Sequence, residues 1–295
     1  MKKIILVVLL MQAISTCVMA QNADAVTIKT EKVTDNVYFL QGINGFGGGN
    51  VVASVGEDGI LLVDDMYASM HEKLMSALSA LSAKPVRIVL NTHYHGDHIQ
   101  GNRNFQNNAV IIAHENVPMR LVKTNTEARP TGGMMPSVTF TDSLIVHFNG
   151  EDIKLLHFPN SHTDGDAVIY FTKSKLLHLG DMFFFGMFPA VYSEGGGNIR
   201  QLVISLEAVS RRVPSDAQVV PGHGNLATMQ DLQAYIAMLK ETIAAVDAAA
   251  RAGKTLDQMK AEKILSKYDA LGQGGAQTTD QYLAMLYKLL VTEKG

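Results

Sequence analysis

Three histidines and one aspartate stand close together in the segment Thr92-His93-Tyr94-His95-Gly96-Asp97-His98. Imidazole nitrogens and carboxylate oxygens are ligands that zinc prefers in proteins. Alternate residues of an extended segment project to the same side, so His93 and His95 can bind one ion. Asp97 and His98 follow where the chain turns into a helix, and there they can face a second ion. The motif therefore predicts a metal site rather than a chance cluster of polar residues in a loop.

Three further residues with metal-binding side chains lie beside predicted strands. His162 directly precedes an apolar strand, Asp181 follows one in a Gly-Asp pair, and His223 follows another in a Gly-His pair. Strand-end loops are where rigid sheets present functional side chains. Each residue alone would more often be a surface or capping residue. Together with the first motif, they predict one composite site.

These motifs, in this order, resemble those of the metallo-β-lactamase superfamily, and the resemblance covers nearly all of the chain after the first 20 residues. It implies an α/β fold, the four-layer αββα sandwich, with two Zn²⁺ ions at one edge, and other divalent transition metals are possible. By motif, the first ion would be held by His93, His95 and His162. The second would be held by Asp97, His98 and His223, with a bridging carboxylate from Asp181.

Asp64 ends an apolar strand over residues 60–63 and matches an aspartate of the superfamily that orients the ligand loop from behind. Its alternative role is that of a turn residue at the end of the strand. The other histidines match no ligand position of the superfamily. We expect them to be surface or partly buried structural residues: His71, His114, His147, His157 and His178.

Two zinc ions about 3.5–4 Å apart share a hydroxide, because coordination lowers the pKa of water to about 7. This hydroxide is the expected nucleophile of a hydrolysis reaction, and Asp97 could take up a proton. Redox chemistry is not expected, because zinc does not change its valence. A structural zinc site is usually closed by four protein ligands, whereas this ligand set leaves room for water. The pattern therefore favours an enzyme over a zinc-storing or structural protein without turnover.

The superfamily includes β-lactamases, thioesterases, lactonases, ribonucleases, phosphodiesterases and sulfatases. The sequences and spacing around His162 and His223 are most similar to those of exported β-lactamases that have one cysteine ligand. However, Asp181 stands where those enzymes place that cysteine, and residues 182–185 lack their substrate-binding lysine. We therefore predict a small-molecule substrate, namely a small ester, lactone or amide, with β-lactam hydrolysis as the alternative.

Aromatic and methionine side chains follow the bridging position at residues 182–189, and Phe46 and residues 134–136 are expected to help cover the site. Such walls suit an apolar acyl or ring group. Phe183 and Phe185 could instead pack inside the sandwich. The glycine-rich residues 45–49 are either a mobile flap or a hairpin loop. They are not a phosphate cradle, since no Lys-Ser/Thr pair and no helix follow them.

Hydrophobic periodicity predicts one compact α/β domain over residues 21–295. Helices are expected over residues 67–81, 198–211, 229–251, 256–267 and 279–292. A further helix is expected to follow the strand over residues 109–113 and to end near Lys123. Strands are expected over residues 26–32, 36–40, 50–55, 59–63, 87–90, 109–113, 138–140, 144–148, 152–158, 167–171, 175–179 and 217–220.

The first 20 residues resemble an export signal, with a basic start, an apolar stretch over residues 4–10 and a small residue, Ala20, before Gln21. Cleavage there predicts a periplasmic or secreted protein. An uncleaved anchor and a lipid on Cys17 are the alternatives. No later apolar run is long enough to span a bilayer, so no stable membrane insertion is expected after cleavage.

Cleavage would also change the composition in two ways. It removes Cys17, the single cysteine, so the mature chain would have no thiol ligand or disulfide. It removes two lysines and no acidic residue, which takes the formal net charge from −3 to −5. An acidic protein is a poor nucleic-acid binder, because that affinity depends on lysines and arginines that neutralise phosphates.

Overall fold

The computed structural model describes residues 25–125, 131–275 and 277–292. The expected leader, with Cys17 and the cleavage site after Ala20, lies outside the described residues. Within those ranges, no helix has both the length and the apolar character that crossing a bilayer requires.

The first sheet contains β1 (Thr27–Lys32), β2 (Val37–Ile43), β3 (Val51–Gly56), β4 (Gly59–Val63), β5 (Val86–Leu90), β6 (Val110–His114) and β7 (Val138–Phe140) in chain order. Strands β1 to β4 pair antiparallel, and β4 to β7 pair parallel. Every residue of β4 is buried, as expected for a strand with both faces covered. The parallel pairing of β4 and β5 places their carboxyl ends at the same edge.

The second sheet contains β8 (Ser143–Phe148), β9 (Glu151–His157), β10 (Ala167–Phe171), β11 (Leu176–His178), β12 (Gln218–Val220) and β13 (Ala227–Thr228). Its spatial order is β13-β12-β11-β10-β9-β8. Only β11 and β12 pair parallel. In β9 the buried Ile153 and Leu155 alternate with the exposed Asp152 and Lys154, which is the pattern of a strand with one face on a core.

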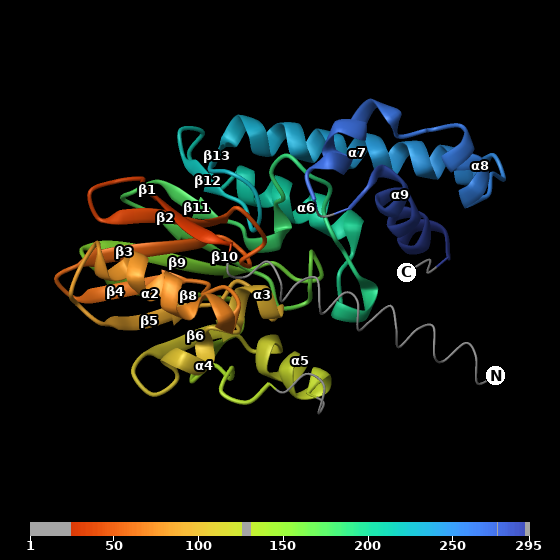
Figure 1. Ribbon diagram of the computed structural model, residues 1–295. Coiled ribbons are helices and arrows are strands. Elements are labelled where there is room, and N and C mark those ends of the chain that lie inside the picture. The colour runs from red at the N-terminus through yellow and green to blue at the C-terminus, as the bar shows by residue number, and fades with distance from the viewer. Residues whose placement is uncertain (1–24, 126–130, 276, 293–295) are drawn as a thin grey trace.

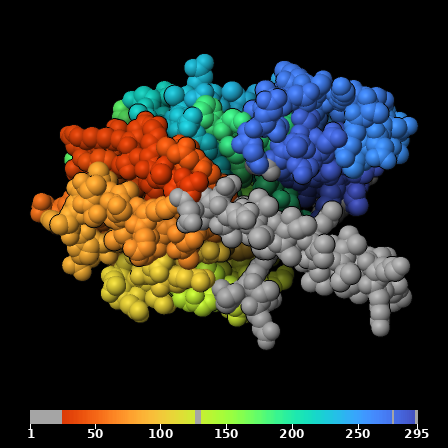
Figure 2. Space-filling view, in the orientation of Figure 1, coloured from red at the N-terminus to blue at the C-terminus, as the bar shows by residue number. Residues whose placement is uncertain are grey.

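Helical segments lie on the outer sides of both sheets (Figure 1). The first sheet is accompanied by η1 (Ala68–Met70), α2 (His71–Ser79), α3 (Gly96–Ile99), α4 (Asn102–Phe105) and α5 (Asn116–Thr124). The second is accompanied by η2 (Gly180–Met182), η3 (Ser193–Gly195), α6 (Ile199–Ser210), α7 (Met229–Arg251), α8 (Leu256–Ala261), η4 (Ser266–Gln273), α9 (Thr279–Tyr287) and η5 (Lys288–Thr292). In the space-filling view, the first-sheet half (red to yellow) occupies the left and lower surface and the C-terminal helices (blue) the upper right (Figure 2).

Three apolar layers hold these elements together. Between the sheets, Phe39 and Leu61 of the first sheet share a buried cluster with Ile169 of the second. Outside the first sheet, α2 contributes buried leucines to a second cluster. Outside the second sheet, α6, α7 and α9 bury their apolar faces in a third. The order helix, sheet, sheet, helix confirms the expected αββα sandwich.

The expected elements match the structure best where periodicity is strong. β4, β7, β10 and α7 have the predicted bounds, and α7 begins with a capping box formed by Thr228 and Asp231. The single helix expected over residues 256–267 is wrong. α8 ends at Ala261, Lys263 adopts a left-handed conformation with φ 51°, and a 3-10 segment begins only at Ser266. A left-handed residue cannot continue a right-handed helix.

Candidate metal centre

The metal-binding side chains come from strand ends at one edge of the two sheets. The loop after β5 carries His93 and His95, and α3, which follows at once, carries Asp97 and His98. The second sheet contributes three residues from the loop after β9, from η2 after β11 and from the segment after β12, namely His162, Asp181 and His223. Because β11 and β12 are parallel, their carboxyl ends present Asp181 and His223 side by side.

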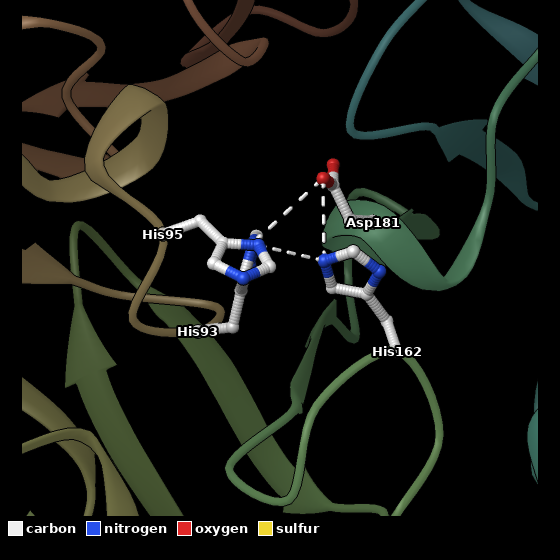
Figure 3. A group of neighbouring side chains, drawn as sticks. All are labelled: His93, His95, His162 and Asp181. Atoms are coloured by element: carbon white, nitrogen blue, oxygen red, sulfur yellow. Dashed lines mark hydrogen bonds and ion pairs between the residues drawn. The ribbon is translucent and has the colours of Figure 1, made fainter. Parts of the chain in front are cut away.

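The first ligand group consists of His93, His95, His162 and Asp181, whose nearest ligand atoms all lie within 4.8 Å of one another. Their side chains point toward a common centre (Figure 3). His95 Nδ1 lies 3.1 Å from His93 Nε2 and 2.9 Å from His162 Nε2. The carboxylate oxygen Oδ2 of Asp181 lies 3.7 Å from His93 Nε2 and 3.5 Å from His162 Nε2. Three nitrogens and one oxygen form a set that suits zinc.

The second ligand group consists of Asp97, His98, His223 and again Asp181. The other carboxylate oxygen of Asp181, Oδ1, lies 3.1 Å from His98 Nε2 and 3.3 Å from His223 Nε2. Asp97 Oδ2 lies 3.2 Å from His223 Nε2. Asp181 thus directs one oxygen to each group, which is the geometry a bridging carboxylate needs.

Two buried atoms of the second group show that the residues present fit a cation. His98 Nε2 and Asp181 Oδ1 are inaccessible to solvent and face each other at 3.1 Å, yet neither makes a well-aligned hydrogen bond with a described residue. Buried polar atoms without partners are rare, because each costs about 1–3 kcal/mol of desolvation. A divalent cation between them would satisfy both atoms. The site therefore fits the metal ions that its residue types predict.

Asp64 holds the ligand loop from behind. Its carboxylate accepts hydrogen bonds from the Thr92 backbone N–H at 2.8 Å and from the Thr92 hydroxyl at 2.7 Å. His98 Nδ1 lies 2.7 Å from Asp64 Oδ2. Since Nδ1 donates to this carboxylate, the lone pair of His98 Nε2 is left for the site. Asp64 is fully buried and has a φ of 59°, so it also turns the chain at the end of β4.

A second supporting carboxylate, Asp166, was not predicted from the sequence. It is buried and accepts hydrogen bonds from the backbone N–H groups of His162, at 2.6 Å, and Thr163, at 2.8 Å. His162 Nδ1 donates to the carbonyl oxygen of Ala190 at 2.7 Å, which fixes the orientation of its ring. The sequence feature that could have indicated this role is the position of Asp166 four residues after His162, in a Thr-Asp-Gly-Asp loop.

Two glycines let the backbone approach the ligands closely. A Cβ on Gly49 would lie 2.1 Å from Cε1 of the His98 ring, and one on Gly222 would lie 1.9 Å from Asp181 Oδ1. The Gly49 N–H donates to the Asp97 carbonyl oxygen at 2.8 Å. The C-terminal part of the glycine-rich segment 45–49 therefore packs directly against the ligand-bearing turn.

The two ligand groups differ in their electrostatics. Burial lowers the pKa of the histidines of the first group, that of His95 to about 3, and so favours neutral rings with free lone pairs. Burial also opposes a charge on His98 and His223. The carboxylates around them, Asp181 foremost, outweigh this effect and raise the pKa of His98 well above its usual range and that of His223 to about 9. The second group thus attracts positive charge.

A cavity of about 710 Å³ opens over both groups. Its apolar wall includes Phe46, Phe184 and Met187, and Gln41 and Asn50 supply polar groups. The Phe46 side chain is 45% exposed, and its ring lies 5.3 Å from that of His223.

The other aromatic and methionine side chains divide between core and surface. Phe183 is fully buried among the outer helices, and Phe185 packs against the same cluster, in agreement with their packing interpretation. Met134 is buried, while Met135 is 38% exposed.

None of the remaining histidines belongs to a ligand group among the described residues. The expectation that they are at most partly buried is wrong for two of them. His178 is fully buried and its Nδ1 accepts a hydrogen bond from the Gly180 N–H, while His114 is 3% exposed and stacks on His157 with ring centroids 3.6 Å apart. Close tertiary packing at the ends of β11 and β6 covers both rings.

A family model described as the metallo-beta-lactamase superfamily matches residues 44–245. The chain belongs to this superfamily. It is 24% identical over 230 residues to a metallo-beta-lactamase type 2 from Bacteroides fragilis, covering 74% of this chain and 88% of the relative. It is 31% identical over 157 residues to a hydroxyacylglutathione hydrolase from a Synechococcus strain, covering 52% and 56%.

A structure of a metallo-beta-lactamase from Pontibacter korlensis has a similar fold, with a TM-score of 0.62 and 17% identity over 72% of this chain and 99% of that one. Membership of the metallo-β-lactamase superfamily, together with the clustered histidines and aspartates, supports a metal-binding hydrolase that acts on small molecules.

Proposed function

We propose that the protein is an exported binuclear zinc hydrolase that cleaves a small, uncharged ester, lactone or amide. The observation that carries this proposal is the pair of ligand groups joined by the two oxygens of Asp181 beneath an open cavity. A closed structural zinc site would offer no such access, which disfavours a non-catalytic zinc-binding protein.

The first ion would be held by the neutral imidazoles of His93, His95 and His162, and the second by Asp97, His98 and His223, with Asp181 shared. When bound, such a metal pair supplies an activated water and polarises the scissile bond. Asp64 keeps His98 in the tautomer that faces the site. The carboxylate oxygen Oδ2 of Asp97 contacts Nε2 of His223. The other oxygen, Oδ1, can hold a proton and pass it to the leaving group.

The walls of the cavity support an uncharged substrate. Within the described residues, no lysine or arginine lines it. The carboxylate of a β-lactam would therefore lack a charge-assisted contact worth about 1.5–3 kcal/mol, or roughly ten- to a hundredfold in binding. β-Lactam hydrolysis remains the second candidate, because this chain matches 88% of the length of the relative from Bacteroides fragilis, which is named a metallo-beta-lactamase.

The test is a panel of esters, lactones, thioesters, phosphodiesters and β-lactams on zinc-loaded protein. We expect two zinc ions per chain by elemental analysis, and the highest kcat/KM on an ester or lactone. His95→Ala should abolish all turnover, whereas His147→Ala, on an exposed side chain, is the matched control. A β-lactam that is hydrolysed faster than every ester and lactone would replace this proposal with the second candidate.

A further inference from the structure

A second cavity, of about 570 Å³, adjoins the first and is not needed for metal binding. His95, Asp97 and Tyr192 line both cavities, so the two meet at the ligand groups. Its walls come from α3, α4, α5 and the segment before β7. Each cavity has the size of a small-molecule site. A substrate whose scissile bond lies beside His95 and Asp97 can therefore extend in two directions.

The second cavity has polar side chains without hydrogen-bond partners in the described part of the chain. Tyr67, Tyr94 and Gln100 line it, and the hydroxyl and amide groups of these three residues make no hydrogen bond with a described residue. The Gln100 amide nitrogen lies only 2.8 Å from where a Cβ on Gly96 would stand, so it sits against the turn that carries Asp97. All three side chains are half-buried, so their polar groups remain available to a bound molecule.

The position of the two tyrosines ties them to the reacting centre. The Tyr94 ring packs against that of the ligand His95, with centroids 4.6 Å apart. The Tyr67 ring meets Phe46 of the first cavity edge-on at 5.9 Å. Both tyrosine rings therefore contact either a side chain of the first cavity or a ligand histidine.

The chemistry of this wall is that of a site for hydroxyl groups. Phenols and a primary amide both donate and accept hydrogen bonds, as an alcohol does, and none of the three is an ionic group. Arg103 also lines the cavity, but it already interacts with another group. The first cavity, by contrast, offers Phe46, Phe184 and Met187 to an apolar group.

We propose that the second cavity binds the alcohol portion of an ester substrate and that this portion carries free hydroxyl groups, while the apolar acyl portion lies in the first cavity. The proposal rests on the hydrolase function proposed above. Hydrolysis would add the OH of water to the acyl carbon and break the acyl C–O bond. The second hydrogen of water would pass to the departing alcohol oxygen.

The test compares two esters of one apolar acid, the ethyl ester and the 2,3-dihydroxypropyl ester, on zinc-loaded protein. We expect kcat/KM to be higher for the dihydroxypropyl ester. The ratio of the two values should fall by roughly 2- to 12-fold in each of Tyr67→Phe, Tyr94→Phe and Gln100→Leu, which is the effect of one neutral hydrogen bond. Tyr38→Phe, which removes a phenol hydroxyl at the far end of β2, should leave the ratio as it is.

A second measurement does not depend on turnover. Saturation-transfer NMR with the matching 2,3-dihydroxypropyl alkyl ether, which cannot be hydrolysed, should show contacts to the glyceryl protons in the wild-type protein. These contacts should weaken in Gln100→Leu relative to the alkyl protons. Thermal unfolding of each variant shows whether it is folded.

The outcomes separate the two proposals. Turnover of both esters with a ratio that no variant changes overturns the subsite and leaves the hydrolase intact. No ester turnover, with glyceryl contacts that Gln100→Leu removes, overturns the hydrolase and keeps the subsite. A preference of the wild-type protein for the ethyl ester over the dihydroxypropyl ester, or an ether that contacts the protein through its alkyl protons alone, contradicts the hydroxyl assignment.

Discussion

Gly222 stands beneath the carboxylate that both ligand groups share. In Gly222→Ala, the new Cβ would lie 1.9 Å from Asp181 Oδ1 and 2.7 Å from the carbonyl carbon of Gly180. Since Cβ atoms do not approach other heavy atoms closer than 3.0 Å, Oδ1 would have to move by about 1.1 Å. Metal–ligand distances tolerate deviations of only about 0.2 Å. The displaced oxygen can then no longer serve the second ion.

We expect Gly222→Ala to bind one zinc ion per chain instead of two after dialysis, as measured by elemental analysis. The first ion should remain, because Oδ2 is the oxygen that faces His93 and His162. Turnover should fall by about a hundredfold, a loss that a 1 Å misplacement at a catalytic centre can cause.

The matched control for this substitution is Gly132→Ala, where the new methyl group meets no atom of the described residues within 4 Å. It should keep both ions and the wild-type activity. Thermal unfolding of the apo-proteins shows whether Gly222→Ala still folds. A folded Gly222→Ala protein that keeps two tightly bound ions would refute the reasoning.

Three further predictions concern other parts of the molecule. Asp64→Asn should weaken zinc affinity by about 10- to 100-fold in a chelator competition, because the amide no longer offers a charged oxygen to His98 Nδ1. An unchanged affinity would show that Asp64 acts only as a turn residue at the end of β4. Burial, and next the adjacent His157, lower the pKa of His114 to about 4. Neutral His114 therefore contributes stability above about pH 6.5 that is lost as the pH falls toward 4. The difference in unfolding free energy between wild type and His114→Gln, from urea titrations, should shrink over that range, and a constant difference would contradict the shift. Intact-mass analysis of exported protein should give a mature N-terminus at Gln21, and a chain that retains Met1 or a lipid on Cys17 would disprove the cleavage.

The types of the metal-binding residues and their order along the chain are properties of the sequence alone. In His93-Tyr94-His95-Gly96-Asp97-His98 the spacing is short, so local backbone geometry suffices to bring several side chains together. The same holds for elements with strong periodicity: α7 begins at its capping box and runs through 23 residues as predicted. The resemblance to the superfamily then implied the αββα layers, which the fold confirms.

Tertiary structure alone decided which atoms meet. His93 and His223 follow strands of different sheets, and only the packing of those sheets brings one oxygen of Asp181 to each ligand group. The support of His162 by Asp166 and Ala190 likewise depends on loops distant in sequence. Packing also buried His114 and His178, whereas local periodicity alone had indicated partly buried or surface residues.

The second cavity has the same origin. Tyr67, Tyr94 and Gln100 show no common pattern in the sequence, and they share a wall because η1, α3 and the loop after β5 meet at one sheet edge. Hydrophobic periodicity in the sequence indicates which face of its own helix or strand a residue occupies. Distances between side chains of different elements depend on the register and packing of whole sheets, and these are set by the cooperative burial of many residues at once.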